Sequence, residues 1–270
     1  PPIDPEAPCF GEYICYYIDG TPMDPNEYPE FPGEIPEYWY GGGGNGNSGN
    51  GNQGSPNGIK TSELSNAHKA LLQIAIEEIL IKCGFKALYN KINNEGDVTI
   101  RLGPAGNARY LTSKVIEYNQ EFPNLVLQDA GTLAHELFHA YQHQLVYGTV
   151  MTSLGSNHIN IEFEQMVFQD IVNRISDGGT GRVGTMFNQN NIPGFQSAID
   201  AYKTWISQLT NYGTIYPDLN SIPGFDAAYM SHLHNFKIYG HPIYTVSDVV
   251  VGLLPNALKQ FYNNSFNCND

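Results

Sequence analysis

The segment AHELFHAYQH, residues 134–143, carries two histidines four positions apart, with a glutamate directly after the first. Residues i and i+4 of an α-helix lie on one face, so the side chains of His135 and His139 point the same way. Two imidazoles placed like this can bind one zinc ion, and Glu136 can then accept a proton from a water on the metal. The alternative is a helix whose histidines bond only to backbone or water. The pattern predicts zinc ligands at His135 and His139 and a general base at Glu136.

The HELFH motif resembles the active-site helix of zincin metallopeptidases. The longer string LAHELFHAYQH, followed by NIEFEQMVFQD, resembles bacterial exported and lipoprotein zincin-like proteins of the gluzincin type. This resemblance covers residues 128–175. It implies a zinc cofactor, a helical C-terminal half and a small sheet whose edge strand lies above the cleft.

A third ligand must come from another part of the chain. The metzincin pattern requires Gly and His at the positions of Gln142 and Leu145, so that pattern is excluded. The gluzincin pattern takes a glutamate from the next helix, where Glu162 and Glu164 are both available. Helical periodicity favours Glu164, which shares a face with apolar residues where a carboxylate needs a partner. The resemblance favours the first glutamate, and on that basis we assign the third ligand to Glu162.

Residues that support the chemistry carry weaker signals. Asp170 and Asp129 are candidates for orienting the ligands from behind. His143 is turned away from the ligand face and is expected to be exposed or to lie behind the ligands. The oxyanion formed during hydrolysis needs a hydrogen-bond donor, and the candidates are Tyr229, His232, His234, Tyr239 and His158.

The elements around the motif favour an α+β fold, mainly helical with a small mixed or antiparallel sheet. Apolar spacing predicts a helix over 62–84 that ends at Gly84. Alternation predicts strands within 97–102 and 108–119. Further helices are expected over about 128–146, 159–177, 192–205 and 222–236, with a last one starting near Pro255.

Composition divides the chain into three parts. Residues 1–40 are acidic and rich in proline and aromatic residues, and we interpret them as an N-terminal arm. Residues 41–58 are half glycine and otherwise polar, which predicts a flexible linker. Residues 59–270 form the predicted zincin-like metallopeptidase domain.

The formal net charge of −14, with only 13 Lys and Arg, argues against nucleic acid or an anionic membrane as a partner. No apolar run is long enough for a transmembrane helix. The four cysteines form no Cys-x-x-Cys pair and are either unpaired or joined in disulfides such as Cys9–Cys15 and Cys83–Cys268. We expect an extracytoplasmic protein, secreted or attached to the cell surface by a lipid anchor.

The predicted function is zinc-dependent hydrolysis of a peptide or protein substrate, with Glu136 as general base. One alternative is a non-catalytic cell-surface binding protein that keeps the zincin scaffold. A metal-dependent deacylase is another, because the same water chemistry cleaves other amides.

Overall fold

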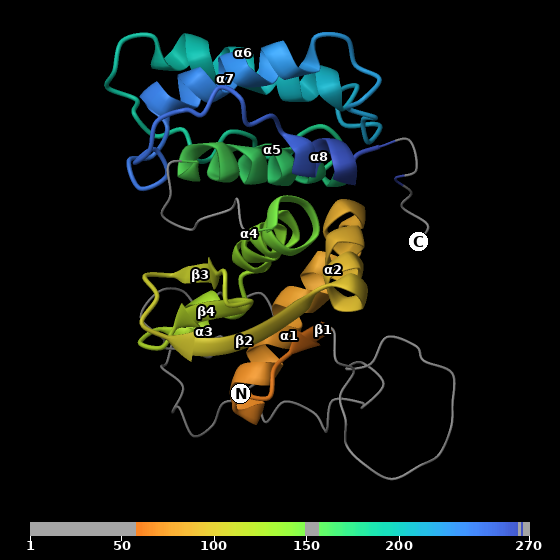
Figure 1. Cartoon of the computed structure of the whole chain (residues 1–270), viewed down its shortest axis with the longest axis vertical. Coiled ribbons are helices and arrows are strands. Elements are labelled where there is room, and N and C mark those ends of the chain that lie inside the picture. The colour runs from red at the N-terminus through yellow and green to blue at the C-terminus, as the bar shows by residue number, and fades with distance from the viewer. Residues whose placement is uncertain (1–57, 149–156, 264–265, 267–270) are drawn as a thin grey trace, which may run out of the picture. The chain divides into compact units, whose positions relative to one another are not determined.

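The fold is known from a computed structural model that describes residues 58–148, 157–263 and 266. All of these belong to one compact unit, Asn45–Asp270. They form a small sheet and a larger set of helices (Figure 1), which confirms the predicted mainly helical α+β class. The predicted arm, and the predicted linker up to residue 57, lie outside the described residues.

The sheet has four strands in the order β1-β2-β4-β3. β1 pairs in parallel with β2, β2 pairs in parallel with β4, and β3 is antiparallel to β4. The predicted strand at 97–102 is β2, and the segment 108–119 is a hairpin of β3 and β4. The short β1 was not predicted, and it begins at the last residue of the predicted linker. The strands are β1 Gly58–Lys60, β2 Asp97–Gly103, β3 Ala108–Leu111 and β4 Val115–Asn119.

Eight α-helices and a π-helical turn make up the rest of the described regular structure. The helices are α1 Asn66–Ile81, α2 Cys83–Glu95, α3 Pro123–Val126, α4 Ala130–Tyr141, α5 His158–Ser176, α6 Phe195–Leu209, α7 Phe225–Tyr239 and α8 Asn256–Phe261, and the π-helical turn is Gln142–Tyr147. None of the helices in the described ranges is both long enough and apolar enough to cross a bilayer.

The prediction of one helix ending at Gly84 was wrong. The chain leaves helical geometry at Lys82, which ends α1 and begins α2, so Gly84 lies in the first turn of α2. A Cβ on Gly84 would lie 2.4 Å from the side chain of Val172 on α5. The glycine is therefore explained by close helix packing and not by a helix end.

Cys83, the first residue of α2, is disulfide-bonded. The interpretation of four unpaired thiols was therefore wrong. Cys9, Cys15 and Cys268 lie outside the described residues.

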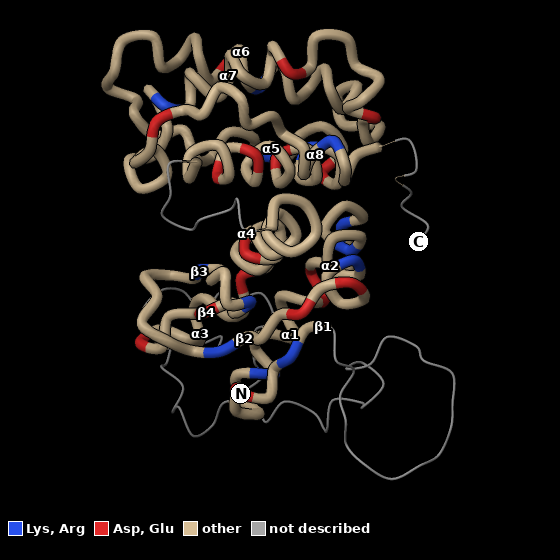
Figure 2. Tube along the Cα trace, viewed as in Figure 1, with Lys and Arg blue, Asp and Glu red and all other residues tan. Residues whose placement is uncertain are grey.

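Two central helices carry the motif residues. α4 lies between the sheet and α5, and α6 and α7 lie on the far side of α5 (Figure 1). The side chain of Asp129 caps the start of α4 by accepting a hydrogen bond from the backbone N–H of Gly131 at 2.9 Å. α5 is covered on nearly all sides, since every residue from Ile159 to Phe168 is buried. Charged residues are scattered along the trace (Figure 2).

Candidate metal centre

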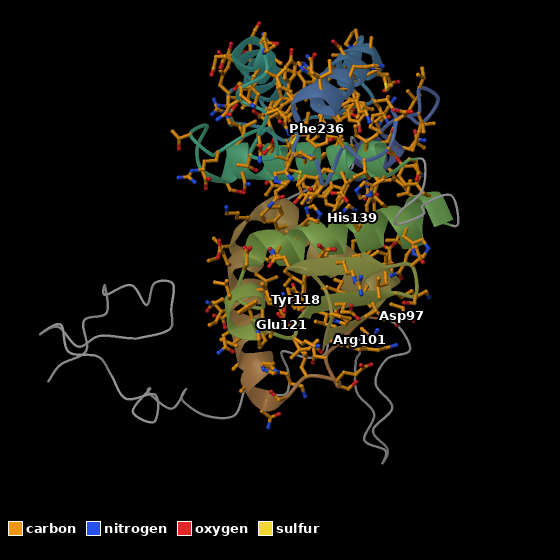
Figure 3. All side chains as sticks on the ribbon, turned by 90° about the vertical axis from the view of Figure 1, so that its left-hand side faces the viewer. Asp97, Arg101, Tyr118, Glu121, His139 and Phe236 are labelled. Atoms are coloured by element: carbon orange, nitrogen blue, oxygen red, sulfur yellow. The ribbon has the colours of Figure 1, made fainter. Side chains whose placement is uncertain are left out.

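Three predicted ligands meet between α4 and α5. The Nε2 atoms of His135 and His139 are 3.0 Å apart. One carboxylate oxygen of Glu162 lies 3.4 Å from His135 Nε2, and the other lies 3.3 Å from His139 Nε2. Figure 3 shows His139 on α4 where that helix faces α5. One ligand atom from each residue lies within 4.8 Å of the other two, so a single ion can reach all three.

The surroundings of these atoms fit a divalent cation. Glu162 Oε2 is buried and has no hydrogen-bond partner among the described residues, and such an orphaned acceptor is costly. Burial alone would raise the pKa of Glu162, but the two histidines hold it well below its usual range. Burial would likewise lower the pKa of His139, but the charge and hydrogen bond of Glu162 raise it to about 9. The site thus attracts positive charge, and two imidazoles with one carboxylate are a ligand set of catalytic zinc.

Glu164, the alternative third ligand, faces away from the histidines. Its carboxylate accepts hydrogen bonds from Gln142 Nε2 at 2.8 Å, from Tyr147 Oη at 3.0 Å and from the backbone N–H of Leu258 at 3.0 Å. Burial raises its pKa to about 7. Glu164 therefore ties α5 to the π-helical turn and to α8.

Gln142 orients one ligand from behind. Its Oε1 lies 2.8 Å from His139 Nδ1, and its Nε2 donates to the backbone carbonyl of Ile161 at 3.1 Å as well as to Glu164. With Nδ1 donating to this oxygen, the lone pair of His139 Nε2 is free for a metal. The sequence had drawn attention to Gln142 only as a departure from the metzincin pattern.

The two aspartates proposed for this orienting role do other work. Asp129 bonds the first turn of α4, at Gly131 and Thr132. Asp170 accepts hydrogen bonds from the backbone N–H of Gly184 at 2.9 Å and from Tyr202 Oη at 2.8 Å. Neither has a hydrogen bond or an ion pair with a predicted ligand, so the prediction that they orient the ligands was wrong.

Glu136 lies beside the ligands and is only 5% exposed. Burial raises its pKa, while the charges of His135 and His139 act in the opposite direction. The backbone of Tyr110, on strand β3, hydrogen-bonds the Glu136 carboxyl. The Tyr110 hydroxyl is in turn 2.9 Å from His143 Nδ1, so the half-buried His143 holds the strand from behind the motif.

A cavity of about 950 Å³ opens onto these residues. Residues 106–111, in and before edge strand β3, form one wall. His158, Arg182, Ile243 and Tyr244 contribute to the rest of the lining. The ring of Tyr244 lies 6.4 Å from that of His135, and burial raises the pKa of Tyr244. Tyr244 was missed from the sequence because it lies in a loop without apolar periodicity.

Four of the five predicted oxyanion donors lie elsewhere. The hydroxyls of Tyr229 and Tyr239 donate to backbone carbonyls at 3.4 and 3.1 Å. His232 stacks on an indole ring, and His234 bonds the preceding turn of its own helix. None of these four lines the cavity, so those predictions were wrong. His158 does line it, with its Nδ1 3.9 Å from the Glu162 carboxylate.

Comparison with protein-family models, with curated proteins and with solved structures found no match to this chain. Evidence for function therefore lies in the site itself: the three candidate ligand atoms, the adjoining Glu136 and the cavity that exposes them.

Proposed function

We propose that this protein hydrolyses peptide bonds with a zinc ion held by His135, His139 and Glu162. The observation that carries the proposal is the meeting of three ligand atoms within 4.8 Å of one another, in the lining of a large cavity and beside Glu136. When bound, zinc in such a three-ligand site keeps a fourth position for water, lowers the pKa of that water and polarises the substrate carbonyl.

Glu136 is the general base. Its carboxylate accepts the proton of the attacking water and passes it to the leaving amine. Burial raises the pKa of Glu136 above its usual value, which makes its carboxylate a stronger base for the proton of the water. The hydrogen bond from the backbone of Tyr110 fixes the carboxyl against the wall of the cleft.

Strand β3 orients the substrate. Within the described residues β3 pairs only with β4, so its other edge is open to an extended peptide. Residues 106–111 line the cavity that contains the ligands, so a peptide paired there passes the zinc site. Tyr244 lines the same cavity, and its raised pKa keeps the hydroxyl protonated, as a donor to the developing oxyanion must be.

An extracytoplasmic location, secreted or lipid-anchored, is part of the proposal. The disulfide at Cys83 supports it, because such bonds form and persist mainly in oxidising compartments.

The test combines metal analysis with digestion of a peptide library. The zinc-loaded wild type should hold close to one zinc per chain and cut a subset of peptides. Glu136→Gln should keep the zinc and lose at least about 100-fold in activity, the lower range of general-base catalysis. The matched control is Glu121→Gln, an exposed glutamate that does not line the cavity, and it should match wild type in both measurements.

Two outcomes would redirect the proposal. Zinc binding with no peptide cut by the wild type would favour the non-catalytic binding protein. Cleavage of acylated amines, but of no peptide, would favour the deacylase. Wild-type protein that takes up no zinc would reject the metal centre altogether.

A further inference from the structure

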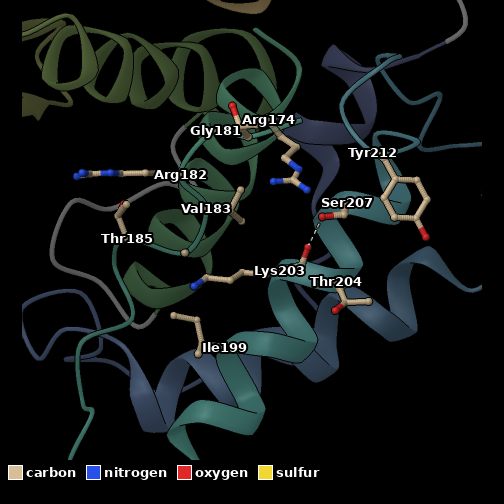
Figure 4. A pocket seen from close by; sticks show the side chains of 12 residues that line it. Arg174, Gly181, Arg182, Val183, Thr185, Ile199, Lys203, Thr204, Ser207 and Tyr212 are labelled. Carbon is tan, nitrogen blue, oxygen red and sulfur yellow. Dashed lines mark hydrogen bonds between the residues drawn. The ribbon is translucent and has the colours of Figure 1, made fainter. Parts of the chain in front are cut away.

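A second cavity, of about 630 Å³, lies between the loop that follows α5 and one face of α6. Arg174, Arg182 and Lys203 contribute to its lining, together with the hydroxyl side chains of Thr180, Thr185, Thr204 and Ser207. No acidic residue is among the described residues that line it. In Figure 4 the ends of Arg174 and Lys203 face the middle of this group, whereas Arg182 extends outward on the other side of Gly181 and Val183. We call this cavity the basic pocket.

The cations of the basic pocket form no salt bridge among the described residues, and only the charge of Lys203 acts at longer range on Asp170. Eight of the 13 lysines and arginines form a salt bridge within the described residues, and five do not. Three of those five are Arg174, Arg182 and Lys203. In a chain with a net charge of −14, three cations without a salt bridge at one cavity make that cavity attract anions locally.

The acids closest to the basic pocket are held by other partners. Asp170 lies behind it and accepts hydrogen bonds from the backbone of Gly184 and from Tyr202. The carboxylate of Asp177 lies 3.9 Å from Lys82, between α1 and α2. In addition, the Nε atom of Arg174 is buried without a hydrogen-bond partner in the described structure. An acidic ligand at the guanidinium would place negative charge beside this unpaired donor.

The backbone at the rim is strained in a way that shapes the basic pocket. Tyr212, which lines it, has a φ of 58°, in the left-handed region that a bulky side chain rarely adopts. The turn is possible because Gly213 packs directly on Gly179, where a Cβ on Gly213 would lie 2.4 Å from the Gly179 Cα. The ring of Tyr212 is 67% exposed at the rim. Strain of this kind is concentrated at binding and active sites.

The basic pocket adjoins the cleft of the metal centre. Arg182 and Thr185 line both cavities. Arg174 follows Glu162 by twelve residues on α5, a rise of about 18 Å along the helix axis. An extended peptide covers that distance in about five residues.

We propose that the basic pocket binds a carboxylate side chain of an acidic peptide whose backbone lies in the zinc cleft. Arg174 and Lys203 contact the carboxylate, and Arg182 lies where the peptide passes from one cavity to the other. The identification of that peptide as a substrate rests on the proposed function, whereas its binding does not. The preferred substrates then carry Asp or Glu within about five residues of the bond that is cut.

Binding is measured by fluorescence polarisation with two labelled probes, hexaglutamate and the uncharged hexaglutamine. The protein is the full chain carrying Glu136→Gln, which prevents cleavage, and each measurement is made with zinc and after its removal. We expect hexaglutamate to bind in both states, more weakly as salt is added, and hexaglutamine to bind at least about tenfold more weakly. Arg174→Gln and Lys203→Gln should each weaken hexaglutamate binding about tenfold, the loss of one charge-assisted hydrogen bond. Lys69→Gln, which removes another unpaired lysine remote from both cavities, should have no effect.

Equal binding of the two probes, or equal effects of Lys69→Gln and Lys203→Gln, would overturn the proposal. The proposal would also be overturned if hexaglutamate binding is lost when zinc is removed, because the carboxylates would then be binding the metal. If inorganic phosphate binds the basic pocket and hexaglutamate does not, the pocket is a small-anion site, and the proposal is also overturned.

Digestion by the wild type separates this proposal from the proposed function. If replacing Glu by Gln in the peptides does not change the rate of cleavage, the proposed preference for acidic substrates is overturned, whereas the proposed peptidase activity is not. Absence of cleavage, with hexaglutamate binding that depends on Arg174 and Lys203, rejects the peptidase and supports the acidic-peptide site.

Discussion

Replacing Gln142 tests how the proposed metal centre is held together. The side chain is fully buried and makes three hydrogen bonds, to His139 Nδ1, to the Ile161 carbonyl and to Glu164. Gln142→Leu keeps about the same volume and removes all three. His139 then loses the acceptor that fixes its tautomer and ring orientation, so its Nε2 is no longer held toward Glu162.

Loss of such an orienting partner typically weakens metal binding by about 10–100-fold, or about 1.4–2.8 kcal/mol. The fold should lose stability as well. An unsatisfied buried group costs about 1–3 kcal/mol, and Gln142→Leu leaves His139 Nδ1 without its acceptor. The Ile161 carbonyl keeps its helical bond within α5, and Glu164 keeps its bonds from Tyr147 and Leu258. We expect zinc affinity, measured by competition with a chelating dye, to fall within that range and the Tm of the zinc-free protein to fall as well.

Two further variants isolate the effect on the metal. Gln142→Glu keeps an oxygen acceptor for His139 but sets a carboxylate oxygen against Glu164 and the Ile161 carbonyl, so it should bind zinc more tightly than Gln142→Leu although its Tm also falls. Gln144→Leu, on the same π-helical turn, removes bonds to the Asp97 backbone and to Tyr110 but touches no ligand. It should lower Tm without lowering zinc affinity. The proposed role of Gln142 is refuted if Gln142→Leu binds zinc as tightly as wild type does, or if Gln144→Leu weakens zinc binding as much as Gln142→Leu does.

Three other predictions concern single side chains. Glu162→Gln should weaken zinc binding more than about 100-fold, beyond the range typical of an orienting partner, while Glu164→Gln should change it less than about tenfold in the same titration. A larger loss of zinc affinity in Glu164→Gln than in Glu162→Gln would make Glu164 the ligand. Asp170 has a pKa raised to about 7 in the folded protein, chiefly by burial, against about 3.9 when unfolded, so the folded state binds the extra proton and stability falls as pH rises from about 4 to 7. Urea unfolding across that pH range should show that the free energy of unfolding falls by up to about 4 kcal/mol more in wild type than in Asp170→Asn. Equal pH dependence of the two proteins would contradict this prediction. Tyr244→Phe should leave zinc content unchanged and lower kcat more than it changes KM, by about 10–100-fold; a change in KM alone would place Tyr244 in substrate binding only.

Some features of the site were accessible from local pattern. The four-residue spacing of His135 and His139 fixes their common face in any α-helix, and Glu136 follows as their neighbour. The long apolar pattern of 159–177 likewise predicts α5. These predictions succeed because helical geometry depends on the nearest turns of the chain alone.

The choice between Glu162 and Glu164 shows where periodicity fails. An apolar stripe identifies the inward face of a helix only if the other face is exposed. α5 is packed by α4 on one side and by α6, α7 and α8 on others, so both glutamates are buried. Burial therefore could not tell which of them faces the histidines, and Glu162, which does, was chosen from the resemblance to gluzincins.

By itself, then, the sequence determined a mainly helical α+β chain with a His pair and a glutamate on one helix. Only the tertiary structure decided which groups complete the site: Glu162 facing the pair, Gln142 behind His139, Tyr244 at the rim and the basic pocket beside the cleft. These groups come from a second helix, a π-helical turn and loops. Their positions are set by long-range packing, which leaves no period in the local sequence.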